Sequence, residues 1–214
     1  MKNVLLFIVL FVGLLSVKPN MSKADEYYRL ADKFLTEGLL INEDEGLTKK
    51  QKLQKLIDKY IGSMDLAWNA KMALGRPYQK LSKEEQKEYI DEYSRYVAYV
   101  WLPKFNFNRK NGVKITVLEK TQKINDTDAN VKMVVEDPNA SKYDVVIRTR
   151  ITKDGEFKLL NMSVEGIDLA NSYRAQFTSY IEQHNNDPRS IIEYLKKQNK
   201  IQKAKALFTV NLKK

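Results

Sequence analysis

Apolar residues in the first half of the chain recur at spacings of three and four, which is the period of an α-helix. The pattern predicts four helices, running from about residue 28 to 41, from 48 to 60, from 63 to 74 and from 82 to 101. Ser82 and Glu85 form a capping-box pattern at the start of the fourth helix. Gly75 suits the C-terminal cap of the third, with Pro77 just beyond it.

The period changes at Lys110-Asn111-Gly112 from helical to alternating, which predicts a sheet. Four strands are expected at about 113–120, 129–136, 143–152 and 156–164. The short turns between them favour an antiparallel meander. Two further helices follow, the first over 168–184 and the second after Asp187-Pro188. The order of elements predicts an α+β domain: a four-stranded antiparallel curved sheet, packed against helices, that encloses an apolar cavity.

The first residues have the composition of a secretory signal peptide. Lys2 precedes an apolar run from Val4 to Leu15, which is too short for a membrane span of roughly 20 residues. Ser22-Lys23-Ala24 offers a cleavage site. We therefore expect a signal peptide at residues 1–24, one domain at 25–199 and a basic tail at 200–214, with an uncleaved anchor as the alternative.

Positive charge gathers at the end of the chain, where residues 196–214 hold seven lysines and no acid. The body from Asp25 to Leu195 is formally neutral, so nucleic acid is not an expected partner. The tail is expected either to touch an anionic membrane or acidic partner, or to be a solvated, frayed end. The chain has no cysteine, which excludes disulfides and thiolate chemistry.

Residue patterns typical of enzymes are scarce. His184 is the only histidine, and no G-x-S-x-G elbow or glycine-rich phosphate loop is present. We expect no catalysis, no metal and no cofactor; the rival interpretation is an enzyme with an acid–tyrosine pair, Glu165 and Tyr173. A stripe of aromatic residues suits either ordinary core or the mouth of a pocket for an amphiphile. It comprises Trp68, Tyr89, Tyr93, Tyr96, Tyr99, Trp101 and Tyr173.

Two segments resemble the MlaC family, the periplasmic phospholipid-binding component of the Mla lipid-transport system, also called the toluene-tolerance or Ttg auxiliary family. The first, MSVEGIDLANSYRAQF, spans Met162–Phe177 and is similar to the pattern V-x-V-E-G-[IV]-S-L-[VI]-x-[NT]-Y-R-x-Q-F. The second spans Met64–Tyr93 and matches at Asp65, Leu74, Gly75 and Tyr78. Three positions depart from the family pattern: Phe157 stands for Trp, Asn161 for Asp and Asp168 for Ser.

The resemblance implies a fold akin to nuclear-transport-factor-2-like domains and a monomeric periplasmic carrier that serves the lipid asymmetry of the outer membrane. Its implied partners are phospholipid, an inner-membrane ABC transporter complex and an outer-membrane lipoprotein complex. A structural envelope protein that binds membrane through its lysine tail is a further alternative. Arg174 is expected either to hold the lipid phosphate or to form an ion pair, with Glu165 as the candidate partner. The expected pocket residues are Leu74, Tyr96, Val100, Val117, Met133, Val135, Val145, Ile147, Ile167, Tyr173 and Phe177.

Overall fold

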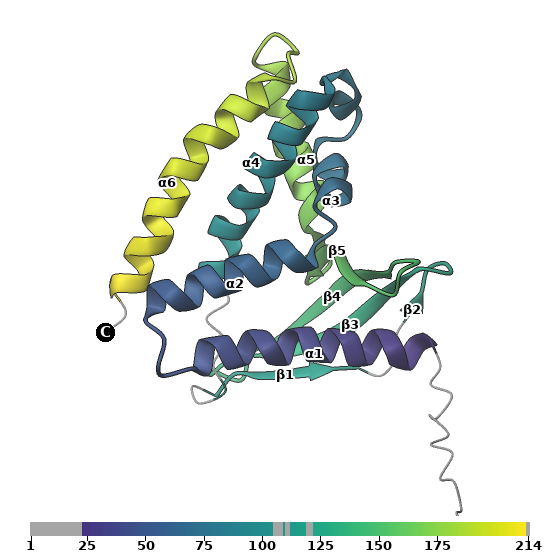
Figure 1. Ribbon diagram of the computed structural model, residues 1–214, viewed down its shortest axis with the longest axis vertical. Coiled ribbons are helices and arrows are strands. Elements are labelled where there is room, and N and C mark those ends of the chain that lie inside the picture. Colours follow the sequence, from purple (N-terminus) through teal and green to yellow (C-terminus); the bar gives the residue numbers. More distant parts are fainter. Residues whose placement is uncertain (1–22, 105–108, 110–111, 119–121, 213–214) are drawn as a thin grey trace, which may run out of the picture.

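The computed structural model describes residues 23–104, 109, 112–118 and 122–212 (Figure 1). Apart from its last two residues, the expected signal peptide lies outside this part of the chain. The helices are α1 (Lys23–Glu43), α2 (Lys49–Ser63), α3 (Leu66–Leu74), α4 (Lys83–Trp101), α5 (Leu169–Glu182) and α6 (Ser190–Leu212), with two short 3-10 helices, η1 (Arg76–Lys80) and η2 (Leu102–Lys104). The strands are β1 (Lys114–Val117), β2 (Gln122–Lys123), β3 (Asp128–Glu136), β4 (Lys142–Ile151), β5 (Phe157–Val164) and β6 (Ile167–Asp168).

Side-chain caps fix the start of three helices in the N-terminal half. Thr48 and Ser82 each form a complete capping box, at α2 and α4 respectively. The third helix begins later than the sequence predicted, at Leu66, because the Asp65 carboxylate accepts a hydrogen bond from the Trp68 N–H and so caps it. Gly75 ends α3 with φ 69°, a value that glycine adopts without strain.

The sheet is antiparallel with the order β1-β3-β4-β5-β6, and β2 also pairs with β3. The predicted α+β class and meander are confirmed, but the expected count of four strands was wrong because β2 and β6 are two residues long. A strand this short shows no alternation in the sequence. β6 forms because Glu165 and Gly166, both at positive φ, reverse the chain and bring Ile167 opposite Val164.

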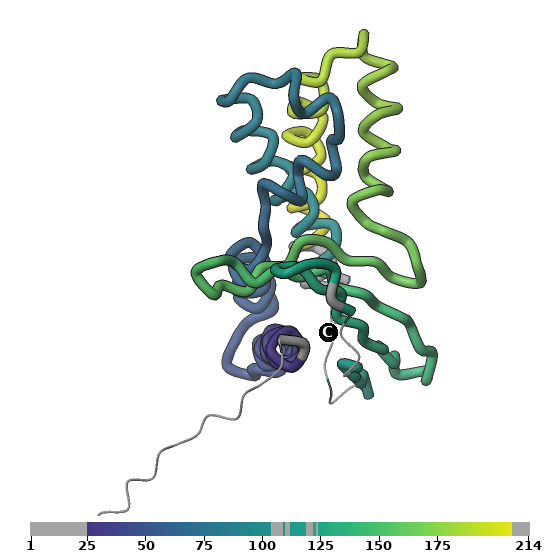
Figure 2. Tube along the Cα trace, turned by 90° about the vertical axis from the view of Figure 1, so that its right-hand side faces the viewer, coloured from purple at the N-terminus to yellow at the C-terminus, as the bar shows by residue number. Residues whose placement is uncertain are grey.

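The apolar interior divides into three clusters, which we name by position. The sheet cluster joins the inward side chains of β3, β4 and β5 to Tyr27 and Ala31 of α1. The helical cluster lies among α3, α4, α5 and α6. The junction cluster consists of Leu53, Ile57, Ala98 and Ala206. Figure 2 shows α1 nearly end-on within the curve of the sheet, with α4, α5 and α6 rising above it.

The last helix continues across residue 200, where the sequence suggested a separate tail. Ala206 is 3% exposed and belongs to the junction cluster, beside Leu53 and Ile57 of α2. Residues 200–206 are therefore part of the packed domain, since an apolar contact on this side of α6 holds them. Within the described residues, no helix is both long and apolar enough to cross a bilayer.

A buried charge network fastens α3 to the outer face of the sheet. The Asp128 side chain is 1% exposed and pairs with Arg148 at 3.1 Å and with Arg150 at 2.7 Å. Arg150 also pairs with Asp65, the cap of α3, at 3.2 Å. Burial alone would raise the pKa of Asp128, but the hydrogen bonds from Arg150 and Arg148 outweigh it and lower the pKa from 3.8 to about 2.

We predict that Asp128→Asn lowers the free energy of unfolding by about 3 kcal/mol, because it leaves two arginines without their buried partner. The folded-state pKa lies below the unfolded value, so the native stabilisation is present above about pH 4 and is lost as the pH falls toward 2. Urea unfolding across this pH range measures both effects. Asp154→Asn, at an exposed turn residue, is the matched control. Equal stability of the two variants at pH 7 would contradict the role of Asp128.

Candidate functional site

The sheet cluster is built from alternate residues of neighbouring strands. Successive side chains of a strand point to opposite faces, so one face of β3 and β4 is apolar and the other polar. Five predicted pocket residues lie on the apolar face or at its edge, each 8% exposed or less: Val117, Met133, Val135, Val145 and Ile147. Tyr27 of α1 also belongs to this cluster, and its hydroxyl donates a hydrogen bond to the Thr127 carbonyl.

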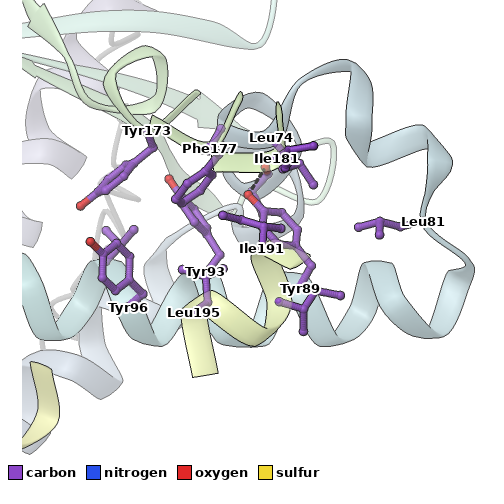
Figure 3. Close-up of a cluster of buried hydrophobic side chains, with 14 residues drawn as sticks. Leu74, Leu81, Tyr89, Tyr93, Tyr96, Tyr173, Phe177, Ile181, Ile191 and Leu195 are labelled. Atoms are coloured by element: carbon purple, nitrogen blue, oxygen red, sulfur yellow. Dashed lines mark hydrogen bonds between the residues drawn. The ribbon is translucent and has the colours of Figure 1, made fainter. Parts of the chain in front are cut away.

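The helical cluster is dominated by aromatic rings (Figure 3). Tyr93 meets Tyr173 edge-on with 5.8 Å between ring centroids and meets Phe177 at 6.0 Å. Tyr96 contacts Tyr173 at 5.7 Å. Such edge-to-face pairs add roughly 0.5–1.5 kcal/mol each beyond the burial of apolar area. Of the predicted pocket residues, Leu74, Tyr96, Tyr173 and Phe177 belong to this cluster, and Val100 packs against it.

The phenols of the helical cluster give the apolar interior a few polar groups. The Trp101 indole N–H donates to the Tyr173 hydroxyl at 2.7 Å, and the Tyr89 hydroxyl donates to the Ala70 carbonyl at 3.1 Å. Burial raises the pKa of Tyr96 to about 12 and raises the pKa of Tyr93 well above its usual value. The cluster thus combines apolar rings with neutral hydrogen-bonding groups, a combination that suits an amphiphile.

Tyr60 of α2 connects the clusters, since it packs against all three of them. Burial raises the pKa of its hydroxyl as well. The sequence predicts a helix over residues 48–60 but does not identify Tyr60, at its end, as a pocket residue. Helical spacing predicts which face of a helix is buried, but it does not show which apolar clusters that face contacts.

A cavity of about 430 Å³ opens between α1 and β1. Val113 and Val117, which line it, also belong to the sheet cluster, so the cavity reaches the apolar interior from the side. Its other walls are Leu35 and Leu39 of α1 and Ile115 of β1, and its polar rim consists of Asp32, Thr36, Arg109 and Lys114. Of the expected pocket residues, Val117 lines this cavity. The sequence did not predict its place beside α1, because that depends on how α1 crosses an edge strand far away in the chain.

A second cavity, of about 440 Å³, lies against the polar face of the sheet. Lys132, Val146 and Arg148 line it, and these residues alternate with the apolar set of β3 and β4. Arg148 lies over the Trp68 ring at 5.1 Å in this cavity's wall. The lining is mixed and includes several side-chain amides, so this cavity suits the apolar part of an amphiphile less well than the cavity beside α1.

Ile167 is the predicted pocket residue that the structure does not bring to either large cluster. Its side chain is 63% exposed. The Glu165–Gly166 reversal puts it on a two-residue strand at the edge of the sheet, where its side chain faces solvent. The resemblance of Met162–Phe177 to a family pattern identified this segment, but it did not show whether the Ile167 side chain points to the interior or to solvent.

Among the described residues, Arg174 forms hydrogen bonds to a backbone carbonyl of α3 and no ion pair with Glu165. Its Nε donates to the Met72 carbonyl at 2.8 Å, and its Nη2 donates to the same oxygen. A Cβ at Gly75 would lie 3.3 Å from the same Nε. Glu165 instead accepts a hydrogen bond from the Asp144 N–H. Arg174 thus satisfies a carbonyl at the C-terminal end of α3, a group that lacks a partner inside the helix.

The residues considered for catalysis have other partners. The Tyr173 hydroxyl is bonded to Trp101, and Glu165 holds the hairpin at Asp144. His184 stacks on Tyr180 with 3.9 Å between centroids, and its Nδ1 lies 2.7 Å from the Tyr180 carbonyl. Across the described part of the chain, no group of three or more acidic or histidine side chains could hold a metal.

We predict that Arg174→Ala lowers the free energy of unfolding by about 1–2 kcal/mol, because a part-buried carbonyl loses its donors. Arg76→Ala is the control, since the Arg76 side chain is exposed and has no hydrogen bond or ion pair within the described residues. Thermal unfolding of the two variants measures the difference. Unchanged stability of Arg174→Ala would show that the hydrogen bonds to Met72 contribute little.

The chain is similar in structure to a phospholipid-binding protein from Ralstonia solanacearum that was solved in complex with a phospholipid. The TM-score is 0.72 at 17% identity, over 82% of this chain and 98% of that one. No match was found among curated proteins. The model of the MlaC protein family matches residues 35–197, which is most of the sequence, and the chain therefore belongs to the MlaC family.

Proposed function

We propose that this protein binds a phospholipid, whose acyl chains enter at the cavity beside α1 and extend past the sheet cluster toward the helical cluster, and carries it between membranes without catalysis. The observation that carries the proposal is the cavity beside α1, which connects the surface to the apolar face of the sheet. Family membership and the lipid complex of the Ralstonia protein support the same ligand.

The energetics require an enclosed apolar site. Each buried CH₂ is worth roughly 0.8 kcal/mol, so moving one chain of about 16 carbons through water costs on the order of 10 kcal/mol. The cavity of about 430 Å³ lies near the lower end of the range for ligand sites, roughly 300–1,000 Å³. A two-chain lipid needs more room than this, so binding requires α1 to move away from the sheet or the two large clusters to separate.

The rim of the cavity offers polar groups for the headgroup. Lys114 is 71% exposed and pairs with Glu136 at 3.0 Å, while Arg109 pairs with Glu43 at 2.6 Å. Both cations lie beside an apolar opening. A phospholipid has the matching arrangement, with an anionic phosphate next to its apolar acyl chains. We assign the headgroup to this rim in preference to Arg174, which lines neither of the two cavities.

Membership of the MlaC family supports the carrier role. We propose that the mature chain begins at Asp25 after removal of a signal peptide and works in the periplasm as a monomer. Its proposed partners are an inner-membrane ABC transporter complex and an outer-membrane lipoprotein complex of the Mla type, which would deliver and receive the lipid. In this scheme the domain needs no cofactor, because exchange follows from docking.

We predict that Ile115→Glu reduces the amount of phospholipid that co-purifies with the chain by more than tenfold, because it places a charge in the apolar wall of the cavity. Ile115 is half-buried, so the fold tolerates a change there better than at Val145 or Ile147, which are fully packed. Native mass spectrometry measures the occupancy, and circular dichroism checks the fold.

Ile167→Glu is the matched control: the same substitution in the same sheet, at a side chain that faces solvent. It should leave lipid occupancy at the native level. Loss of lipid in both variants, or in the Ile167 variant alone, would contradict the proposed site. Absence of phospholipid from the purified native chain, even after incubation with vesicles, would contradict the function itself.

A further inference from the structure

Several lysines of α2 and α6 are exposed and have no acidic partner in the part of the chain that the structure describes. Other lysines of these helices are engaged: Lys59 pairs with Glu37, and Lys196 with Glu88 at 2.7 Å. Lys52 donates to the Asn42 carbonyl. The remaining lysines form no ion pair within the described residues; those near the meeting point of the two helices are Lys49, Lys50, Lys55, Lys200, Lys203 and Lys205, which we call the basic surface.

The two halves of the basic surface lie at the same end of the molecule. Leu53 and Ile57 of α2 share the junction cluster with Ala206 of α6, so the lysines of both helices flank one apolar contact. Figure 1 shows the beginning of α2 beside the last turns of α6. Three acids belong to the α2 side, Asp44 and Glu45 before the helix and Asp58 within it, but α6 holds no acid after Glu193. The positive charge of this end therefore exceeds the negative.

The basic surface also adjoins the mouth of the proposed lipid site. Leu39 of α1 lines the cavity, and Glu43 in the last turn of α1 bonds Arg109 on its rim. One residue earlier, the Asn42 carbonyl accepts a hydrogen bond from Lys52 in the first turns of α2 at 2.7 Å. A single stretch of chain thus joins the cavity rim to the start of the basic surface.

We propose that the basic surface docks the protein on an anionic phospholipid bilayer, with the mouth of the lipid site toward the membrane. This inference rests on the proposed function. The surface contains lysines and no arginine, so it offers mobile point charges and no fixed fork for a particular carboxylate. Neither of the two cavities described above is lined by its residues, and Ile201, 39% exposed, lies among its lysines. These features fit a fluid, extended anionic surface better than a specific acidic protein.

Substitution tests this proposal better than truncation. Removing residues after 199 would also remove Ala206, which is buried against α2, and would disturb the domain. The triple variant Lys200→Gln, Lys203→Gln, Lys205→Gln leaves the apolar contact in place. The corresponding variant in α2 is Lys49→Gln, Lys50→Gln, Lys55→Gln.

The matched control is Lys80→Gln, Lys83→Gln, Lys87→Gln, which removes the same charge from exposed lysines at the far end of α4. Co-sedimentation with phosphatidylcholine vesicles, with and without phosphatidylglycerol, measures docking at low and at physiological salt. Each lysine near an anionic surface contributes about a 5-fold change in binding, so either triple variant should bind phosphatidylglycerol vesicles about 100-fold more weakly than the control at low salt. Higher salt should reduce the difference.

Equal binding of all variants to phosphatidylglycerol vesicles, or equal loss in the control, would overturn the proposal. The α2 and α6 variants could instead keep vesicle binding and lose binding to polyglutamate. That result would assign the basic surface to an acidic protein and would also overturn the proposal. Native mass spectrometry of the same variants separates this inference from the proposed function. Bound phospholipid should be unchanged in all three, because no substituted side chain lines the cavity.

Discussion

The separation of the apolar interior into clusters that meet at Tyr60 is the constraint on which the rest of the structure depends. A single, continuously packed core would have no boundary along which two parts could separate. Here the sheet, helical and junction clusters meet at one side chain of α2, Tyr60. Separation of two apolar surfaces costs free energy unless something apolar fills the gap. A lipid chain meets that requirement, so the same division that would weaken a purely structural domain suits a carrier.

Much of the fold is predictable because its signals are local. Capping boxes at Thr48 and Ser82 mark helix starts, and the alternation along β3 and β4 gives both the sheet and its apolar face. Ten of the eleven expected pocket residues lie in or against the two large clusters for this reason. Local signals do not determine where α1 crosses β1, so they did not predict the position of the cavity there, although Val117, an expected pocket residue, lines it. Nor do they show the reversal that turns Ile167 to solvent, or that Arg174 bonds a carbonyl of α3.

Charges have two different environments in this molecule. On the outer face of the sheet, Asp128 is buried and satisfied by Arg148 and Arg150, a network that holds α3 in place. At the junction of α2 and α6, six exposed lysines form no ion pair with any residue that the structure describes. The buried network stabilises one arrangement of the domain, whereas the exposed lysines leave their electrostatic attraction available to another surface.

The central claim, that acyl chains enter between the helical cluster and the sheet cluster, is tested most directly by fluorescence quenching. Trp101 packs against the helical cluster and bonds Tyr173, whereas Trp68 lies under Arg148 in the wall of the cavity on the polar face of the sheet. The variants Trp68→Phe and Trp101→Phe each leave one reporter, since the chain has two tryptophans. Phospholipid with brominated acyl chains should quench the fluorescence of Trp101 strongly and that of Trp68 little; equal quenching of both, or quenching of Trp68 alone, would contradict the account.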